Sequence, residues 1–370
     1  MRSILFRTMQ LLSCILLLAI GLSFADPALA ASLGADHIAG FFLGGGATGG
    51  VTFAVASIAG RPFPIDQELV ATSIAYKNTS LIADEVLPRI PVSKKEYKWY
   101  KWTKEEGYTL PDTRVGRKSR PNQVEFTASE ETGIAKDYGL DDPIPQDDID
   151  NAPMGLDPRG HAAESLTDLI LLDREVRTAR KVFDANLYAA ANKTTLSGTS
   201  QFSHADSDPI ATITAALDKP LLRPNVGVIG RAAYTILSQH EKIVQATKNI
   251  GGSTAGIAMR RAIAELFELE DLLVGEGFVN TAKRGQNPVF ERVWGKHLLL
   301  LHRNRLARPT MSGTARPTFG FTAQVGNRLA GSMVDANIGL RGGQTVRVGE
   351  TVEEQISAAD LGYFFQNVVA

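Results

Sequence analysis

Two oppositely charged segments stand close together in this chain, and they constrain what it can fold into more than any other feature. Residues 94–120 hold nine Lys or Arg against four acids, with three Tyr and all but one of the Trp residues. Residues 137–150 hold six Asp and no Lys or Arg. A chain that functions as a monomer has little use for a segment whose positive and negative charges are so strongly separated. A subunit that lies across its neighbours has one, because complementary charged patches fix docking partner and register.

Alternation in and after the first segment predicts a long two-stranded hairpin. Tyr97 and Trp99 alternate with more polar residues in its first run, and Val124 and Phe126 do so in its second. The polar stretch between the runs contains the glycines and proline that are typical of turns.

The large and basic side chains of this hairpin are candidates for subunit contacts, since aromatic residues and Arg are enriched at interface cores. Carboxylates of residues 137–150 on a neighbour would receive the basic side chains. Stacking on single-stranded nucleic acid is the alternative, but the adjacent acids and a net charge of −1 oppose it. The predicted inter-subunit contact residues are Trp99, Tyr100, Trp102, Tyr108, Arg114, Arg117, Lys118, Arg120, Asp141, Asp142, Asp147 and Asp148.

A divalent cation is a second hypothesis for the acidic segment, because hard cations bind several carboxylate oxygens. The spacing does not match an EF-hand loop, and Pro143, Pro145 and Pro153 indicate a stiff extended connector. An acidic strip that faces solvent or a neighbouring subunit is the favoured interpretation.

Other patterns that carry chemistry are incomplete. The Gly-rich runs at 44–50 and 251–256 lack the Lys-Ser or Lys-Thr of a phosphate-binding loop. The six His include no i, i+4 pair, and His240 is expected on the exterior of a helix. No Ser occupies a nucleophile elbow. We therefore predict that the chain is not an enzyme and has no catalytic, cofactor-binding or metal site.

Residues 161–191 have the clearest helical pattern. Leu169, Leu172, Val176 and Phe183 recur at helical spacings with charged residues between them, which predicts an amphipathic helix of roughly 46 Å. From Thr214 onward helix and strand patterns alternate, which predicts a mixed α/β region. Helices are expected at 210–217, 231–247 and 256–269, and strands at 225–230, 271–279, 296–303, 318–325, 344–357 and 361–370.

The N-terminus has a different character. Residues 1–30 are arranged like a secretory signal peptide that ends in Ala28-Leu29-Ala30, with an apolar run shorter than the roughly 20 residues of a membrane span. Residues 31–60 are rich in Gly and Ala and nearly uncharged. We predict that residues 1–60 are removed or serve only assembly. A functional export or membrane-tethering signal and a misassigned start codon are the alternatives.

Composition agrees with a large globular protein. The 370 residues, 44% hydrophobic and 21% charged, suffice for two subdomains. A charge near zero argues against simple electrostatic nucleic-acid binding. The single cysteine, Cys14, excludes a disulfide framework and a Cys-based zinc site.

Three segments together resemble the tailed-bacteriophage major capsid proteins of the Hong Kong 97-type fold. They are ATSIAYKNTSLIADEVLPRIPVSKKEYKWYKW (71–102), VGRKSRPNQVEF (115–126) and the long helix after DPRGHAAESL. The resemblance covers residues 66–370 and lies in the order of segments, not in a short motif.

The resemblance implies an α+β fold with a role for each segment. After the leader at 1–30 and the extension at 31–60, it assigns an N-arm to 61–93, an E-loop to 94–136, a peripheral domain with a spine helix (161–191) to 137–213, an axial domain to 214–335, and C-terminal strands that return to the peripheral domain to 336–370.

It also implies a function: self-assembly, as hexamers and pentamers, into an icosahedral shell around double-stranded DNA that is bound without sequence specificity. Further implied partners are scaffolding, maturation-protease, portal and decoration proteins, with a membrane only if the leader is functional. The implied location is a virion capsid assembled in the host bacterial cytoplasm. An encapsulin-like nanocompartment shell is the alternative of the same fold, and an exported or membrane-associated binding protein is the alternative of another class.

Overall fold

A computed structural model describes the chain from Phe63 onward, and residues 63–370 belong to one unit. The described ranges are 63–76, 78–102, 109–125, 128–251, 256–283, 285–304 and 317–370, without the side chains of residues 100–102, 128 and 249–251. The predicted leader and extension lie outside these ranges. Within them, no helix combines the length and hydrophobicity needed to cross a bilayer.

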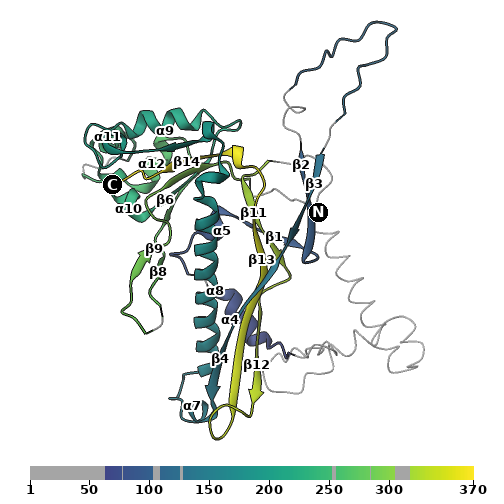
Figure 1. Ribbon diagram of the computed structural model, residues 1–370, viewed down its shortest axis with the longest axis vertical. Helices are drawn as coiled ribbons and strands as arrows, with labels where there is room; N and C mark the ends of the chain where they lie inside the picture. The colour runs from purple at the N-terminus through teal and green to yellow at the C-terminus, as the bar shows by residue number, and fades with distance from the viewer. Residues whose placement is uncertain are drawn as a thin grey trace, which may run out of the picture. The chain divides into compact units, whose positions relative to one another are not determined.

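The first sheet is built around β13 (Gly343–Ile356). On one side β13 pairs antiparallel with β4 (Lys136–Pro145), and on the other with β12 (Leu329–Asp335) and then β11 (Gly320–Val325). β1 (Arg89–Val92) pairs parallel to β11. In Figure 1 the long strands of this sheet run beside the longest helix of the described ranges.

Most of the segment 137–150 is extended, as predicted, but it is not a connector, because it is β4, a paired strand. The short helix α7 (Gln146–Asp150) follows it. Among the described strands β4 pairs with β13 alone. Prolines are tolerated on such an edge strand, where the missing N–H breaks no ladder, which explains Pro143 and Pro145.

The long helix α8 (Pro158–Val182) packs against β13 and β4. Asp157 caps its start, accepting hydrogen bonds from the backbone N of Arg159 and of Gly160, both at 3.1 Å, and Pro158 suits the first helical position. The predicted range of 161–191 is therefore wrong at both ends. The chain leaves the helix at Phe183 and continues in two short 3₁₀ turns, Ala185–Leu187 and Ala190–Asn192.

The buried face of α8 also differs from the predicted one. Leu169 is 53% exposed, and Leu172 and Val176 are half-buried. The face that meets the protein interior mixes small, apolar and charged residues: Ala162, Ala163, Leu166, Thr167, Ile170, Arg174, Glu175, Thr178, Ala179 and Val182. Hydrophobic periodicity missed this face because an Arg and a Glu interrupt it.

The second sheet is buried on both sides. Its strand order is β5 (Lys193–Thr195), β14 (Gly362–Gln366), β10 (Leu298–Leu301), β6 (Val226–Gly230) and β7 (Asp271–Gly275). Successive side chains of a strand point to opposite faces, so Leu298 and Leu300 join one hydrophobic cluster while Leu299 and Leu301 join another. Burial of both faces explains the uninterrupted leucines of β10.

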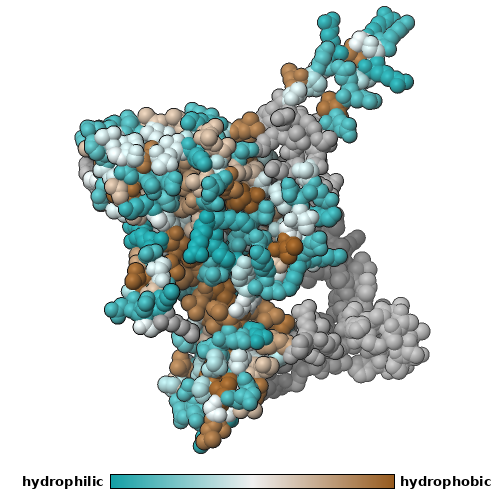
Figure 2. Space-filling model, viewed as in Figure 1, coloured by the Kyte–Doolittle hydropathy of each residue, from teal (hydrophilic) through white to brown (hydrophobic). Residues whose placement is uncertain are grey.

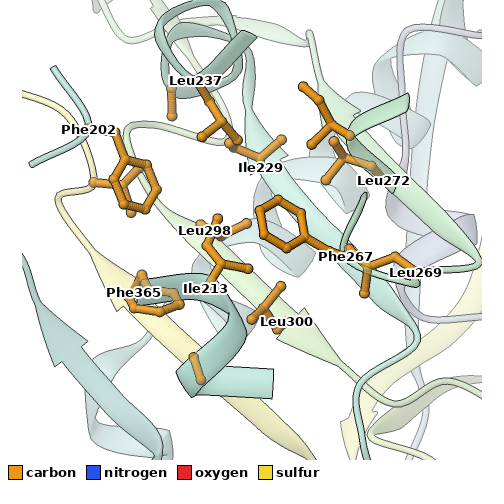
Figure 3. Packing of buried hydrophobic residues seen from close by; sticks show 14 of the residues in the cluster. Phe202, Ile213, Ile229, Leu237, Phe267, Leu269, Leu272, Leu298, Leu300 and Phe365 are labelled. Atoms are coloured by element: carbon orange, nitrogen blue, oxygen red, sulfur yellow. The ribbon is translucent and has the colours of Figure 1, made fainter. Parts of the chain in front are cut away.

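Helices cover one face of the second sheet, and the end of α8 covers the other. The covering helices are α9 (Pro209–Leu217), α10 (Arg231–Gln239), α11 (Glu241–Gly251) and α12 (Arg260–Leu266). Figure 3 shows Ile213, Leu237 and Phe267 gathered with Leu298 and Phe365 in this core. On the opposite face Val182 of α8 packs on the strands.

His240 divides the helix predicted at 231–247 into α10 and α11. Its backbone is extended, with φ −62° and ψ 128°. The predicted exterior position is wrong, since the side chain is buried with Nε2 3.1 Å from Ser207 Oγ. The helix predicted at 256–269 is likewise shorter, because α12 spans only Arg260–Leu266.

Strand pairing corrects the predicted division of the C-terminal half. β11 and β12, expected in the domain at 214–335, belong to the first sheet. β14, expected to return to the sheet beside the long helix, pairs with β10 and β5 in the second sheet. Of the strands after residue 336, β13 alone belongs to the first sheet. The chain therefore crosses between the two sheets repeatedly.

Two small hairpins form two-stranded sheets of their own. β2 (Glu96–Trp102) pairs antiparallel with β3 (Ala128–Ile134), and β8 (Phe278–Asn280) pairs antiparallel with β9 (Phe290–Arg292). The first pair confirms the predicted hairpin, although its second strand begins at Ala128 and not at Val124.

Candidate assembly surface

The base of the β2–β3 hairpin is part of the protein core. Trp99 is 6% exposed, and its ring meets Phe321 of β11 edge-on, with centroids 6.4 Å apart. Tyr97 approaches the same ring and lies opposite Gly133, where a Cβ would come within 2.4 Å of the tyrosine ring. Contacts within the chain thus cover Trp99, and we remove it from the inter-subunit set.

The other predicted aromatic residues are only partly placed. Tyr100 and Trp102 belong to β2, opposite Glu130 and Ala128, and their side chains lie outside the described residues. Tyr108 lies outside the described ranges altogether.

Residues 109–125, which we call the basic loop, project from the β2–β3 pair (Figure 1) and are exposed along their length. Local hydrogen bonds shape two turns: Arg114 N donates to Asp112 Oδ1 at 2.9 Å, and Ser119 N to Gly116 O at 3.0 Å. No acid of the described residues forms an ion pair with its four cations. These loop cations are Arg114, Arg117, Lys118 and Arg120.

Two of the four predicted acids are already paired within the chain. Arg347 donates from Nε and Nη2 to the two carboxylate oxygens of Asp141, both at 2.6 Å. These hydrogen bonds lower the pKa of Asp141 below its ordinary value. Arg341 Nη1 donates to Asp147 Oδ1 at 3.1 Å.

Asp142 and Asp148, which we call the strip acids, have no ion-pair partner among the described residues. Asp148 is exposed on α7 and Asp142 is half-buried on β4. A single chain therefore does not bring its loop cations and strip acids together, and each set is open to a partner.

A buried charged cluster, which the sequence analysis missed, holds residues 82–84 on α8. Glu175 accepts hydrogen bonds from the backbone N of Ile82 and Ala83 at 2.9 and 2.7 Å, and from Trp294 Nε1 at 2.5 Å. Arg174, 1% exposed, donates to Asp84 and to Thr322 Oγ1, the latter at 3.0 Å. A helical count would have found these residues, because Arg174 continues the i, i+4 series of Leu166 and Ile170.

The cluster is balanced in charge. Arg89 bridges Asp84 at 2.6 Å and Glu350 at 2.7 Å. Burial acts to raise the pKa of Asp84, but Arg174 and Arg89 outweigh it and hold that pKa below its ordinary value. The cluster lines a cavity of about 560 Å³ that also includes Arg328. Because the charged groups of this lining are paired and sum to zero, the cluster is best explained as a structural contact between residues 82–89 and α8.

Nothing in the described part of the chain forms a candidate metal centre: no group of three or more His, Cys, Asp or Glu is close enough to share an ion.

Solved structures share this architecture. A phage-related protein from Bordetella bronchiseptica matches with a TM-score of 0.65 at 20% identity, covering 83% of this chain and 99% of that one. The capsid of Cyanophage P-SCSP1u matches with a TM-score of 0.51 at 11% identity, covering 87% and 95%. The fold is the α+β Hong Kong 97-type fold of phage shell proteins, as the sequence predicted. No family model matches the chain.

Sequence relatives identify the family. The major capsid protein of Pseudomonas phage JBD67 is 55% identical over 309 residues, covering 84% of this chain and 98% of the relative. That of Burkholderia phage BcepMu is 27% identical over 312 residues, covering 82% and 96%. The chain belongs to the phage major capsid proteins. It is a structural component of a phage capsid and not an enzyme, and the nanocompartment and exported-protein alternatives are not favoured.

Proposed function

We propose that this subunit forms the icosahedral shell of a tailed-phage virion, as hexamers and pentamers that enclose double-stranded DNA. Its relatives support self-association into a shell. A net charge of −1 agrees with a shell that encloses DNA without a dedicated DNA-binding domain, because such domains are strongly basic and a shell interior need only avoid repelling the packaged DNA. Scaffolding, maturation-protease, portal and decoration proteins are the further partners, and assembly takes place in the host bacterial cytoplasm.

The basic loop is the observation that carries the assembly mechanism. Its loop cations dock on the strip acids Asp142 and Asp148 of a neighbouring copy, while Asp141 and Asp147 stay paired to arginines of their own chain. One exposed ion pair contributes only about 0.2–1 kcal/mol. Repetition around a closed shell makes many such contacts simultaneous, which raises their combined strength without new chemistry.

Residues 1–60 are removed or act only during assembly. One observation supports this: 84% of this chain matches 98% of the JBD67 protein. The remainder of the chain has no counterpart in that match.

The test is a charge reversal in the basic loop. The double variant R117E/K118E is expected to keep the wild-type circular dichroism and melting temperature but to sediment as monomers or small oligomers. Uniform closed shells of wild-type yield, seen by electron microscopy, would contradict the docking. The matched control is R260E/R261E, an adjacent exposed pair at the start of α12, which is expected to assemble normally.

A compensating variant shows whether the strip acids are the receiving surface. Adding D142K/D148K to R117E/K118E restores the opposite charges with reversed sign. Recovery of shells is expected, since attraction depends on the product of the charges. Failure to recover, with an intact fold, would place the loop on another surface.

A further inference from the structure

The β8–β9 hairpin has an aromatic face that its own chain leaves open. Phe278 lies opposite Arg292, and Asn280 opposite Phe290, so these four side chains share one face. Phe278 is 49% and Phe290 67% exposed. The Arg292 guanidinium lies 4.4 Å from the centroid of the Phe278 ring. Exposed aromatic rings with a stacked Arg are typical of an interface core.

Hydrogen bonds extend beyond the paired strands of the hairpin. Asn280 Oδ1 accepts from the backbone N of Ala282 at 3.1 Å and of Val289 at 3.0 Å. At its base Val293 N donates to Gly277 O at 3.0 Å. Figure 1 shows the hairpin projecting from the second sheet. An arm held in one conformation loses little entropy when it docks.

Helix α8 carries a second open apolar surface, the α8 stripe, formed by Leu169, Leu172 and Val176. These residues have the helical spacing of a buried face, yet Leu169 is 53% exposed and the other two are half-buried. Figure 2 shows hydrophobic residues gathered over the middle of α8. A row of apolar side chains at this spacing fits an apolar partner that lies across the helix.

The charges around the two surfaces are opposite. Two acids beside the stripe, Glu164 and Asp168, form no ion pair with a described residue, whereas Asp173 is paired with Arg177 at 3.0 Å. Residues 278–292 of the hairpin include three Lys or Arg and one acid. Opposite charges at the rim orient two surfaces as they meet. Both surfaces belong to a protein that self-associates, so complementary copies are present at high local concentration.

We propose that the aromatic face of the β8–β9 hairpin docks on the α8 stripe of a neighbouring copy, with Phe290 against Leu169. The contact is distinct from that of the basic loop and rests on the proposed self-assembly. Lys283 and Arg292 then face the acids that flank the stripe.

The test uses mixed shells in a cysteine-free chain. Cys14 is the only cysteine, so C14S provides the background into which F290C and L169C are placed in separate chains. Shells assembled from both chains are treated with a short bismaleimide and run on a denaturing gel. At least tenfold more crosslinked dimer is expected from the mixture than from shells of either chain alone. Because each chain has one cysteine, a dimer reports contact between copies.

The control pairs F290C with R261C, an exposed position on α12 away from the stripe. Dimer at the control level in intact shells would overturn the hairpin contact and leave the proposed function standing. Absence of shells from the C14S chain itself would count against the proposed function instead. The two failures are therefore distinguishable.

A second measurement does not depend on crosslinking. The variant F278S/F290S is expected to melt as the wild type does but to yield at least tenfold fewer closed shells. The matched control is V334S, which replaces one exposed apolar residue on β12 and is expected to assemble normally. Wild-type shell yield from F278S/F290S would overturn the proposal, and nucleic-acid retention that falls without loss of shells would assign the hairpin to packaged DNA.

Discussion

At the scale of single residues, Glu175 joins segments that are far apart in the sequence. Its carboxylate accepts hydrogen bonds from the backbone N–H groups of Ile82 and Ala83 and from the Trp294 indole. Burial raises the pKa of Glu175, although these hydrogen bonds and Arg174 act against the rise. The structural role of Glu175 is therefore to accept these hydrogen bonds.

The substitution Glu175→Ala leaves three buried donors without an acceptor. Each unsatisfied donor costs about 1–3 kcal/mol, so the free energy of unfolding is expected to fall by at least about 3 kcal/mol. Urea unfolding of the unassembled chain measures it. Glu164→Ala, on the exposed side of the same helix, is the control and should change stability by less than about 0.5 kcal/mol. Equal effects of the two substitutions would refute the assigned role of Glu175.

The Asp141–Arg347 pair makes stability depend on pH in acid. Hydrogen bonds from Arg347 lower the pKa of Asp141 from 3.8. A carboxylate with a lowered pKa stabilises the fold above its unfolded pKa and loses that contribution as pH falls through the folded value. The contribution, about 0.2–1 kcal/mol for an exposed pair, is thus expected at neutral pH and lost in strong acid. Asp141→Asn should abolish this pH dependence, and a stability difference between wild type and variant that is constant with pH would contradict the pairing.

At the scale of elements, α8 shows what pattern and capping can predict. Its existence and its place before a mixed α/β region followed from periodicity. Its start depended on Asp157, and its buried face on Arg174 and Glu175, whose partners lie about ninety residues away in sequence. The break at His240 has the same origin, because Ser207 meets that imidazole only in the folded chain. Local patterns carry no information about such distant partners.

The α8 cap gives an element-scale prediction. Asp157→Ala removes the acceptor for two N–H groups of the first turn and should lower stability by about 1 kcal/mol. Asp157→Ser retains a capping oxygen and should recover most of the loss. Thermal unfolding of the three chains measures the difference. A serine variant no better than the alanine variant would show that capping is not the cause.

At the scale of the whole molecule, the unit that begins at Pro62 contains both sheets and every described helix. A chain that starts at Pro62 is therefore expected to fold with a melting temperature within about 2 °C of that of the full chain, since it keeps every hydrophobic core of the described residues. Misfolding of this shortened chain would show that the first 61 residues contribute to the fold. Its shell yield reports separately on any assembly role.

The sequence by itself determined the family, the α+β class, the β2–β3 hairpin and the buried strands, because segment order and alternation are local properties of the chain. Only the tertiary structure decided that β11 and β12 join the first sheet and β14 the second, since strands of similar pattern are sorted by long-range hydrogen bonding. It also placed Trp99 in the core and Leu169 on the surface. Burial depends on what packs against a residue. One large hydrophobic side chain can therefore be buried while another is exposed.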